Sequence, residues 1–260
     1  MPKAIFLDID GTLLSFATRQ VPQTALSAMS KAKQDGVKIF IATGRHKNEL
    51  GADPNLTNFP FDGYVTQNGA YCYTREKTVH AVPLKKRTVE FLVELIKKDP
   101  FTCIFCMEDE MFLNSANDHI LELLNSFKLP VPPICDISRA LVSDIYQVVP
   151  IVSIENEKIL YTLPGAKVTK WYSGGYDIIN ENVNKWLGIE KMIDYFGIKR
   201  EDVAAIGDAE NDIEMLVNAG YSVAMGNASD DVKKCAKFVT THVDEDGIKN
   251  AFDYLLGGKT

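Results

Sequence analysis

Two carboxylates one residue apart, Asp8 and Asp10, follow the apolar run Ala4–Leu7 and precede Gly11 and Thr12. A short and wholly hydrophobic run of this kind is typical of a strand buried on both faces of a parallel sheet. Ligands of such sheets bind at the carboxyl ends of the strands, where this acidic pair lies. Two crowded carboxylates repel each other unless a cation or a shared proton intervenes. Taken alone, the pair predicts either a site that holds positive charge or a solvated acidic turn.

Other polar residues also follow predicted core elements. Thr43-Gly44-Arg45 follows the apolar run 37–42, Lys185 lies at the start of a predicted helix, and the acidic segment 207–212 follows the apolar run 203–206. Neighbouring strand ends in a parallel sheet lie about 5 Å apart. This spacing lets four carboxylates converge: those of Asp8, Asp10, Asp208 and Asp212.

This set of residue types favours phosphoryl transfer. A group of carboxylates offers only oxygen ligands, which suit Mg²⁺. Thr43 and Gly44 offer a hydroxyl and backbone N–H groups to phosphate oxygens, and Lys185 offers a compact positive charge to the transferring group. A carboxylate can also attack phosphorus to form an aspartyl-phosphate.

Strands and helices alternate at both ends of the chain, which predicts an α/β fold with helices on both faces of a parallel sheet. The expected helices of these parts cover 23–35, 184–196, 212–219, 229–236 and 248–256. The expected strands cover 4–7, 37–42, 64–66, 203–206 and 221–225, with a hairpin of 71–73 and 79–82.

The middle of the chain instead pairs strands between helices, which predicts an α+β domain inserted into the parallel-sheet domain. Its expected helices cover 85–98, 117–127 and 153–163, and its expected strands cover 101–107, 111–113, 145–149, 168–172 and 176–179. We therefore expect a Rossmann-like core from residues 1–81 and 183–260, and an inserted domain from residues 82–182.

Composition and charge restrict the class of protein. The net charge of −7 argues against a nucleic-acid partner, which calls for a basic surface. No apolar run is long enough to span a membrane, and the first residues do not have the pattern of a signal peptide, so we expect a cytoplasmic protein. The five cysteines are scattered and odd in number, which argues against a disulfide framework. Cys103 and Cys106 form a CxxC within an apolar strand and are interpreted as buried strand residues on opposite faces.

Five segments together resemble the haloacid dehalogenase superfamily and, within it, the Cof-type sugar phosphatases of class IIB. They are 8–14 (DIDGTLL), 42–45 (ATGR), 67–70 (QNGA), 207–212 (GDAEND) and 225–228 (MGNA). The resemblance extends over the whole chain. It implies a Rossmann-like parallel sheet and an α/β cap, the inserted domain, that determines substrate specificity.

The resemblance also implies roles for the four carboxylates. Asp8 would be the nucleophile that forms a phosphoaspartate, and Asp10 the general acid and then the general base. Mg²⁺ would be held by Asp8, Asp208 and the backbone carbonyl of Asp10, with Asp212 supporting its water shell. The residue types alone do not distinguish the nucleophile from the acid. Asp212 also has a simpler interpretation as a carboxylate at a helix N-terminus.

By the same resemblance, Thr43 and the Gly44 N–H would hold phosphate oxygens, Lys185 would pair with the nucleophile and the phosphate, and Asn211 would contact the phosphate region. Arg45 either reaches the substrate or braces its loop. Asn68-Gly69 is interpreted as a tight turn with its backbone near the site.

The chain departs from the family pattern at Trp186, since the family usually has glycine after its lysine. The spacing from Lys185 to Gly197-Ile198 nevertheless agrees with the family. Trp186 either narrows the site or covers the surface of its helix, and we favour the second interpretation.

We therefore expect a Mg²⁺-dependent phosphatase that hydrolyses a small phosphate monoester, a sugar (hexose) phosphate above all. We expect no nucleic-acid or membrane partner, and a monomer or a small homo-oligomer. The alternatives are a phosphotransferase of the phosphomannomutase kind and a non-catalytic protein that binds sugar phosphates.

Overall fold

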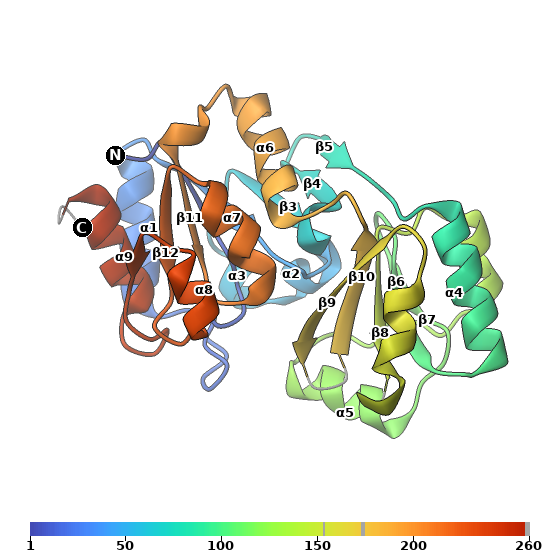
Figure 1. Ribbon diagram of the computed structural model, residues 1–260. Helices are drawn as coiled ribbons and strands as arrows, with labels where there is room; N and C mark the ends of the chain where they lie inside the picture. Colours follow the sequence, from blue (N-terminus) through green and yellow to red (C-terminus); the bar gives the residue numbers. More distant parts are fainter. Residues whose placement is uncertain (153, 173–174, 258–260) are drawn as a thin grey trace. The chain divides into compact units, whose positions relative to one another are not determined.

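The computed structural model describes residues 1–152, 154–172 and 175–257. These residues form two compact units (Figure 1). The first unit consists of Met1–Thr43, Asn55–His80 and the C-terminal part from Asn184. The second consists of Gly44–Pro54 and Ala81–Val183.

The first unit contains a sheet of eight strands in the order β13-β12-β11-β1-β2-β3-β4-β5. The strands are β1 (Ala4–Leu7), β2 (Lys38–Ala42), β3 (Gly63–Thr66), β4 (Tyr71–Tyr73), β5 (Thr78–Ala81), β11 (Val203–Gly207), β12 (Tyr221–Ala224) and β13 (Phe238–Val239). The strands from β13 to β3 pair in parallel, and β4 runs antiparallel to β3. The predicted α/β fold with a parallel sheet core is confirmed.

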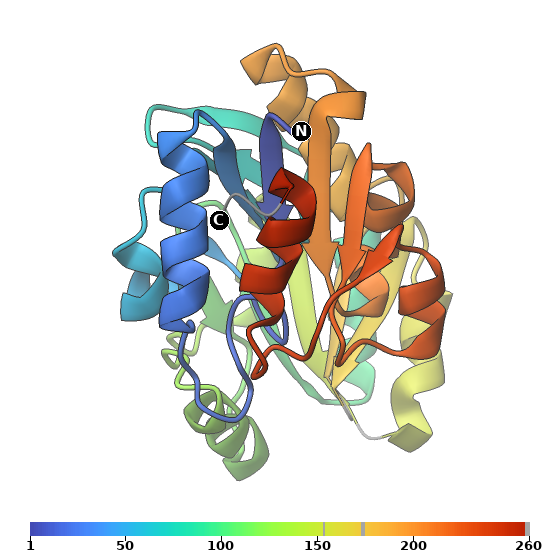
Figure 2. The same ribbon diagram turned by 90° about the vertical axis from the view of Figure 1, so that its left-hand side faces the viewer.

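Helices cover both faces of this sheet. Helices α1 (Gln23–Gln34) and α9 (Gly247–Leu256) contact each other on one face, as Figure 2 shows. On the other face, Ala4 and Phe6 of β1 share a hydrophobic core with buried residues of α6 (Lys185–Phe196), α7 (Ile213–Asn218) and α8 (Asp230–Lys234). Successive residues of a strand point to opposite faces, so the apolar run of β1 packs against both helix layers.

Helix α6 has clear signals at both ends. The side chain of Asn184 accepts a hydrogen bond of 2.8 Å from the N–H of Leu187, which caps the first turn. Gly197 ends the helix with a φ of 65°, a left-handed conformation that glycine adopts without strain. These two ends fix Lys185 as the first helical residue.

The second unit contains a sheet of five strands in the order β7-β6-β8-β10-β9. The strands are β6 (Thr102–Cys106), β7 (Met111–Leu113), β8 (Gln147–Ile151), β9 (Ala166–Tyr172) and β10 (Gly175–Asn180), and the main helices are α4 (Lys86–Lys98) and α5 (Asp118–Ser126). Cys103 and Cys106 lie in two different hydrophobic cores, so they point to opposite faces of β6 as predicted.

Some elements differ from the prediction. The expected helix 153–163 is a 3₁₀ helix, η3 (Ile154–Thr162), and Ser153 lies outside the described residues. Leu160 of η3 is buried, and so is Leu163 directly after its end, at a spacing of three that matches the 3₁₀ repeat. The short helices α2 (Lys47–Ala52) and α3 (Pro54–Thr57) were not predicted. Helix α2 begins with a capping box whose first residue is His46, which is not among the residues preferred at that position.

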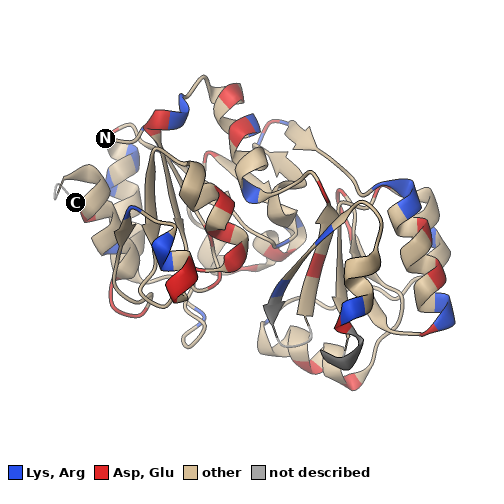
Figure 3. Cartoon of the chain, in the orientation of Figure 1, with Lys and Arg blue, Asp and Glu red and all other residues tan. Residues whose placement is uncertain are grey.

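The remaining elements are the 3₁₀ turns η1 (Gln67–Gly69), η2 (Ile137–Val142), η4 (Arg200–Asp202) and η5 (Glu210–Asp212). Among the described residues, no helix has both the length and the apolar character needed to cross a membrane. Figure 3 shows that basic and acidic residues are interspersed over both units.

Candidate active site

Asp8 and Asp208 emerge side by side from two neighbouring strands at the centre of the large sheet. Strands β1 and β11 pair in parallel with Leu7 opposite Ile206, and the N–H of Asp8 donates to the carbonyl of Ile206 at 3.0 Å. The carboxyl ends of both strands therefore lie at the same edge of the sheet. This register is the reason why residues so distant in the sequence meet.

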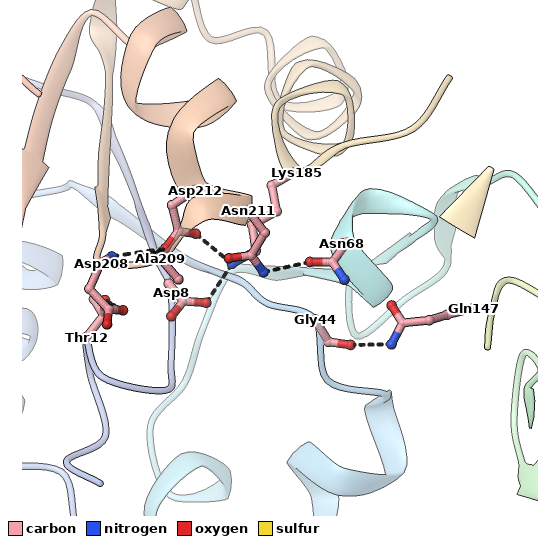
Figure 4. A network of polar contacts seen from close by, with 10 residues as sticks. All are labelled: Asp8, Thr12, Gly44, Asn68, Gln147, Lys185, Asp208, Ala209, Asn211 and Asp212. Carbon is pink, nitrogen blue, oxygen red and sulfur yellow. Dashed lines mark hydrogen bonds and ion pairs between the residues drawn. The ribbon is translucent and has the colours of Figure 1, made fainter. Parts of the chain in front are cut away.

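Three of the four predicted carboxylates form one cluster. Asp8, Asp208 and Asp212 each contribute an oxygen, and these atoms lie within 4.8 Å of one another. The Oδ2 atom of Asp212 accepts hydrogen bonds of 3.0 Å from the N–H groups of Asp208 and Ala209 (Figure 4). Asp212 therefore holds the turn that presents Asp208, and it also lies in the cluster.

Lys185 brings a buried positive charge to this cluster. Its Nζ atom lies 2.7 Å from Oδ1 of Asp8 and 2.6 Å from Oδ1 of Asp212 (Figure 4). The predicted pairing of the lysine with Asp8 is thus present in the geometry, together with a second pairing that was not predicted.

The electrostatics of the cluster favour a further cation. Burial raises the pKa of the Asp208 carboxyl to about 7, and the neighbouring charge of Asp212 adds to this effect. Burial also raises the pKa of Asp8 well above its usual range, although the ammonium group of Lys185 opposes the shift. Burial would lower the pKa of Lys185, but the carboxylates of Asp212 and Asp8 outweigh it and raise the pKa above its usual value. One ammonium group thus faces three carboxylates, which leaves an excess of negative charge in a poorly solvated place.

Asp208 is also held by neutral donors. The hydroxyl of Thr12 donates to its Oδ1 at 2.8 Å, and the amide of Asn227 donates to its Oδ2 at 3.1 Å. Gly11 lies close by with a φ of 85°, and a Cβ there would come within 2.3 Å of Oδ2 of Asp208. The close approach and the left-handed backbone explain the glycine after the acidic pair.

Asp10 lies in a different environment from Asp8. Its side chain is 29% exposed, and its Oδ1 lies 3.9 Å from Nη1 of Arg19. The side chain of Asp8, by comparison, is 8% exposed and pairs with Lys185. Sequence reasoning missed Arg19, because it lies in a loop without a motif and only the fold brings it to Asp10.

Thr43 and Asn211 are linked through Asn68, which was interpreted only as a turn residue. The backbone N–H of Asn68 donates to the carbonyl of Thr43 at 3.0 Å. The side-chain amide of Asn211 donates to Oδ1 of Asn68 at 2.8 Å (Figure 4). The motif that contains Asn68 was visible in the sequence, but the direction of this side chain was not.

Gly44 and Arg45 make contacts within the second unit. The carbonyl of Gly44 accepts a hydrogen bond of 3.0 Å from Nε2 of Gln147 (Figure 4). Arg45 is 9% exposed, and its Nη1 lies 3.4 Å from Oδ2 of Asp53. This pairing agrees with the interpretation that Arg45 braces its loop. Nothing in the sequence indicated Gln147.

Trp186 belongs to the hydrophobic core of the first unit. It is 6% exposed in that core, and the guanidinium carbon of Arg200 lies 5.2 Å from the centroid of its ring. Side chains of successive helical residues point about 100° apart, so Trp186 can pack in the core while Lys185 reaches the carboxylates.

The described geometry offers the parts that phosphoryl transfer requires. It combines a buried carboxylate beside an ammonium group, an oxygen cluster of the type that holds a hard cation, and neighbouring hydroxyl and amide donors. Asn211 brings a side-chain amide from another loop, and Asn68 links it to the end of β2 at Thr43.

Comparisons with known proteins agree with this chemistry. A family model described as haloacid dehalogenase-like hydrolase matches residues 5–252. YkrA of Bacillus subtilis (strain 168) is 29% identical over 254 residues, and the match covers 97% of each chain. Phosphoglycolate phosphatase 1 of Saccharolobus solfataricus is 27% identical over 266 residues, with 100% of this chain and 98% of the other covered. The solved structure of the HAD subclass IIB sugar phosphatase BT4131 is 35% identical, with a TM-score of 0.91 over 97% of this chain and 98% of the other.

These matches extend over almost the whole chain and confirm the resemblance seen in the sequence. The chain therefore belongs to the haloacid dehalogenase-like hydrolases and is a phosphoric monoester hydrolase of that family.

Proposed function

We propose that this enzyme hydrolyses a small phosphorylated metabolite, a sugar phosphate, with Mg²⁺ and through a phosphoaspartate on Asp8. The observation that carries this proposal is the pairing of Asp8 with Lys185 at 2.7 Å within the cluster of carboxylates. The buried ammonium group of Lys185 favours the ionised form of Asp8 and so opposes the effect of burial on its pKa, and only the ionised form is a nucleophile.

The donors at this place fit Mg²⁺. The clustered groups are carboxylate oxygens, which this small, hard cation prefers. Burial makes their ionised forms unfavourable, as the raised pKa of Asp208 shows, and a divalent cation would offset that cost. Asp8, Asp208 and the backbone carbonyl of Asp10 would hold the ion, and Asp212 would support its water shell. When bound, Mg²⁺ would neutralise charge on the phosphoryl oxygens.

In the first half of the reaction, a carboxylate oxygen of Asp8 would attack phosphorus while the bond to the leaving oxygen breaks. Asp10 would donate a proton to that oxygen, so that a neutral alcohol departs. The different environments of the two carboxylates support this division. Asp8 pairs with a buried lysine, whereas Asp10 is more exposed.

In the second half, Asp10 would take a proton from water as the water oxygen attacks the phosphorus of the phosphoaspartate. The bond from phosphorus to the Asp8 oxygen would break, and inorganic phosphate would leave. Asp8 then returns as a carboxylate beside Lys185.

The remaining residues would hold the phosphoryl group. Thr43 would donate its hydroxyl, Gly44 its N–H, and Asn211 a side-chain N–H to phosphate oxygens. Lys185 would face both the nucleophile and the phosphate. Arg45 would reach the substrate only if its pairing with Asp53 opens.

The segment 82–182 would act as the cap that selects the substrate. The sugar phosphatase BT4131 shares 35% identity with this chain over nearly its full length, which supports a sugar phosphate as substrate. Phosphoglycolate phosphatase 1 is less similar, at 27% identity, and indicates a smaller phosphorylated acid as the next class to test. The cytoplasm remains the predicted location.

The deciding experiment measures phosphate release from hexose, pentose, polyol, nucleotide and pyridoxal phosphates and from phosphoglycolate, with Mg²⁺ and with a chelator. We expect Mg²⁺-dependent turnover that is fastest with a sugar phosphate. Release that needs an added acceptor sugar would indicate a phosphotransferase instead. Binding of sugar phosphates without any release would indicate a non-catalytic protein.

A further inference from the structure

The turn η1 has an unusual backbone for residues other than glycine. Gln67, Asn68 and Gly69 have φ values of 51°, 54° and 96°, so three successive residues lie in the left-handed region. For residues other than glycine, this backbone conformation costs about 1–2 kcal/mol of conformational free energy, although asparagine tolerates it better than most. Such strain persists only where the surrounding structure enforces it, and it is found at functional sites.

The surroundings of η1 enforce this shape from two sides. The N–H of Asn68 donates to the carbonyl of Thr43, which fixes the turn to the end of β2. A Cβ at Gly69 would come within 2.1 Å of the carbonyl oxygen of Asn184, so the turn packs directly against the residue before Lys185. A Cβ at Gly188 would in turn come within 3.0 Å of the Cα of Gly69, so helix α6 packs closely on the turn.

The side chain of Asn68 makes a third connection. Its Oδ1 accepts from Nδ2 of Asn211 at 2.8 Å, and neither residue is fully exposed (Figure 4). A side-chain amide has two N–H donors on its nitrogen and an oxygen that only accepts. Once one N–H of Asn211 donates to Asn68, the orientation of the amide is fixed, and with it the direction of the second N–H and of the oxygen.

This orientation matters for a phosphate ligand. Phosphate oxygens accept hydrogen bonds and repel a carbonyl oxygen. Without the acceptor on Asn68, the amide of Asn211 could turn over and present its oxygen to the phosphate. The loss would affect the bound phosphate and the transition state alike, since both carry negative oxygens.

We infer that Asn68 is a positioning residue of the phosphate site, which acts through Asn211 by fixing the direction of its amide. The strained turn η1 keeps Asn68 in place, and it ties Thr43, Asn211 and the start of helix α6 to one another. This inference rests on the proposed phosphatase function.

The test uses Asn68→Gly, which removes the acceptor while glycine accepts a φ of 54° without strain. We expect kcat/KM for p-nitrophenyl phosphate with Mg²⁺ to fall about tenfold, less than the ~10²–10³-fold loss for a removed donor to the transition state. We also expect the inhibition constant of inorganic phosphate to rise by a similar factor. The melting temperature should change little, because the relief of backbone strain offsets the lost hydrogen bond between Asn68 and Asn211.

A double-mutant cycle with Asn211→Ala separates positioning from a general structural role. In the Asn211→Ala background, Asn68→Gly should change kcat/KM by less than about twofold, since the residue through which it acts is gone. If the loss of kcat/KM in the double variant equals the product of the losses in the two single variants, the inference is wrong. It is also wrong if Asn68→Gly keeps the kcat/KM and the phosphate inhibition constant of the wild type.

Lys128→Gly is the matched control, because Lys128 has a φ of 53° and is exposed. It should leave kcat/KM and phosphate inhibition unchanged. The same double-mutant cycle can be measured without turnover, as the dissociation constants of inorganic phosphate with Mg²⁺ determined by calorimetry. A wild-type protein that binds phosphate but releases none would count against the proposed function, while the cycle in binding would still test Asn68.

Discussion

Lys185 and Asp212 form an ion pair with an Nζ–Oδ1 distance of 2.6 Å, and neither side chain is exposed to solvent. The same Nζ atom pairs with Asp8 at 2.7 Å. One buried ammonium group therefore holds two carboxylates that come from opposite ends of the chain. Removal of that charge would leave both acids buried without compensation, which makes the lysine important for folding as well as for its proposed role in the reaction.

Lys185→Met should therefore destabilise the metal-free protein by about 3–5 kcal/mol, the usual loss when one partner of a buried ion pair is removed. Methionine is also long and unbranched, so the change removes mainly the charge. Urea unfolding with and without Mg²⁺ measures the effect, and Mg²⁺ should restore part of the stability.

The matched control is Lys249→Met, because Lys249 pairs with Asp253 at the same distance of 2.6 Å with side chains 39% and 28% exposed. Lys249→Met should lower the free energy of unfolding by less than about 1 kcal/mol. Equal losses at the two positions would contradict the importance of the buried pair.

Asp8→Asn should reduce kcat by about 10⁴-fold or more, the scale on which loss of a nucleophile acts. An amide is a poor nucleophile, so no phosphoaspartate can form. Phosphate release and trapping of the phosphorylated enzyme measure the effect, with circular dichroism to verify the fold. Activity close to that of the wild type would refute the assignment of Asp8.

Asp208→Ala should raise the Mg²⁺ concentration for half-maximal activity by more than about tenfold, the loss expected even for a group that only supports a metal ligand. Asp231→Ala is a suitable control, since that side chain is 87% exposed. Magnesium titration of phosphate release compares the variants. If Asp208→Ala titrates like the wild type, Asp208 does not hold the ion.

Magnesium affinity should depend on pH because burial raises the pKa of Asp208 to about 7 in the metal-free protein. Below that pH the carboxyl holds a proton, which Mg²⁺ must displace. The apparent affinity should therefore rise with pH, by about tenfold per pH unit below pH 7 for the proton of Asp208 and more steeply where Asp8, whose pKa burial also raises, holds a proton as well. Calorimetry at several pH values measures this dependence, and an affinity independent of pH would contradict it.

The raised pKa of Asp208 also makes the stability of the metal-free protein depend on pH, but in the opposite direction to the Mg²⁺ affinity. The raised pKa means that the folded state binds the proton of Asp208 more tightly than the unfolded state does. Its contribution to stability is full below the unfolded pKa of about 3.9 and is lost as the pH rises to about 7. Asp208→Asn should remove this part of the pH dependence in urea unfolding.

Gly69→Ala should destabilise the protein through a direct clash as well as through backbone strain. At a φ of 96°, the new Cβ would lie 2.1 Å from the carbonyl oxygen of Asn184. Overpacking of this kind typically costs about 1–3 kcal/mol. Because the clash falls beside Lys185, kcat/KM should fall as well.

Gly36→Ala separates the two effects, since Gly36 has a similar φ of 86° but nothing within 4 Å of the added Cβ. Backbone strain alone should lower the free energy of unfolding of Gly36→Ala by about 1 kcal/mol, and its kcat/KM should stay unchanged. Thermal unfolding and steady-state kinetics compare the two variants. Equal effects on both would show that close packing at Gly69 does not matter.

Much of the fold could be predicted because it depends on local patterns. The apolar run before Asp8 predicted a buried strand, and the helix expected over 85–98 is confirmed by α4, which buries Val89, Leu92, Val93 and Ile96 at helical spacing. Elements with weak local signals were missed, such as helix α2 with His46 as its cap. The 3₁₀ geometry of η3, where an α-helix was expected, was also missed.

By itself, the sequence determined the residue types at the strand ends, the α/β class and the family. These depend on local composition, periodicity and motifs, which one chain displays directly. Only the tertiary structure decided that Asp8 shares Lys185 with Asp212, that Asp10 lies near Arg19, and that Asn68 accepts from Asn211. The reason is physical: strand order and the packing of α6 bring distant segments within hydrogen-bond distance, and no local pattern encodes which side chain then meets which. Asp8 and Asp10 are equivalent acids in the sequence, and their surroundings in the fold make them different.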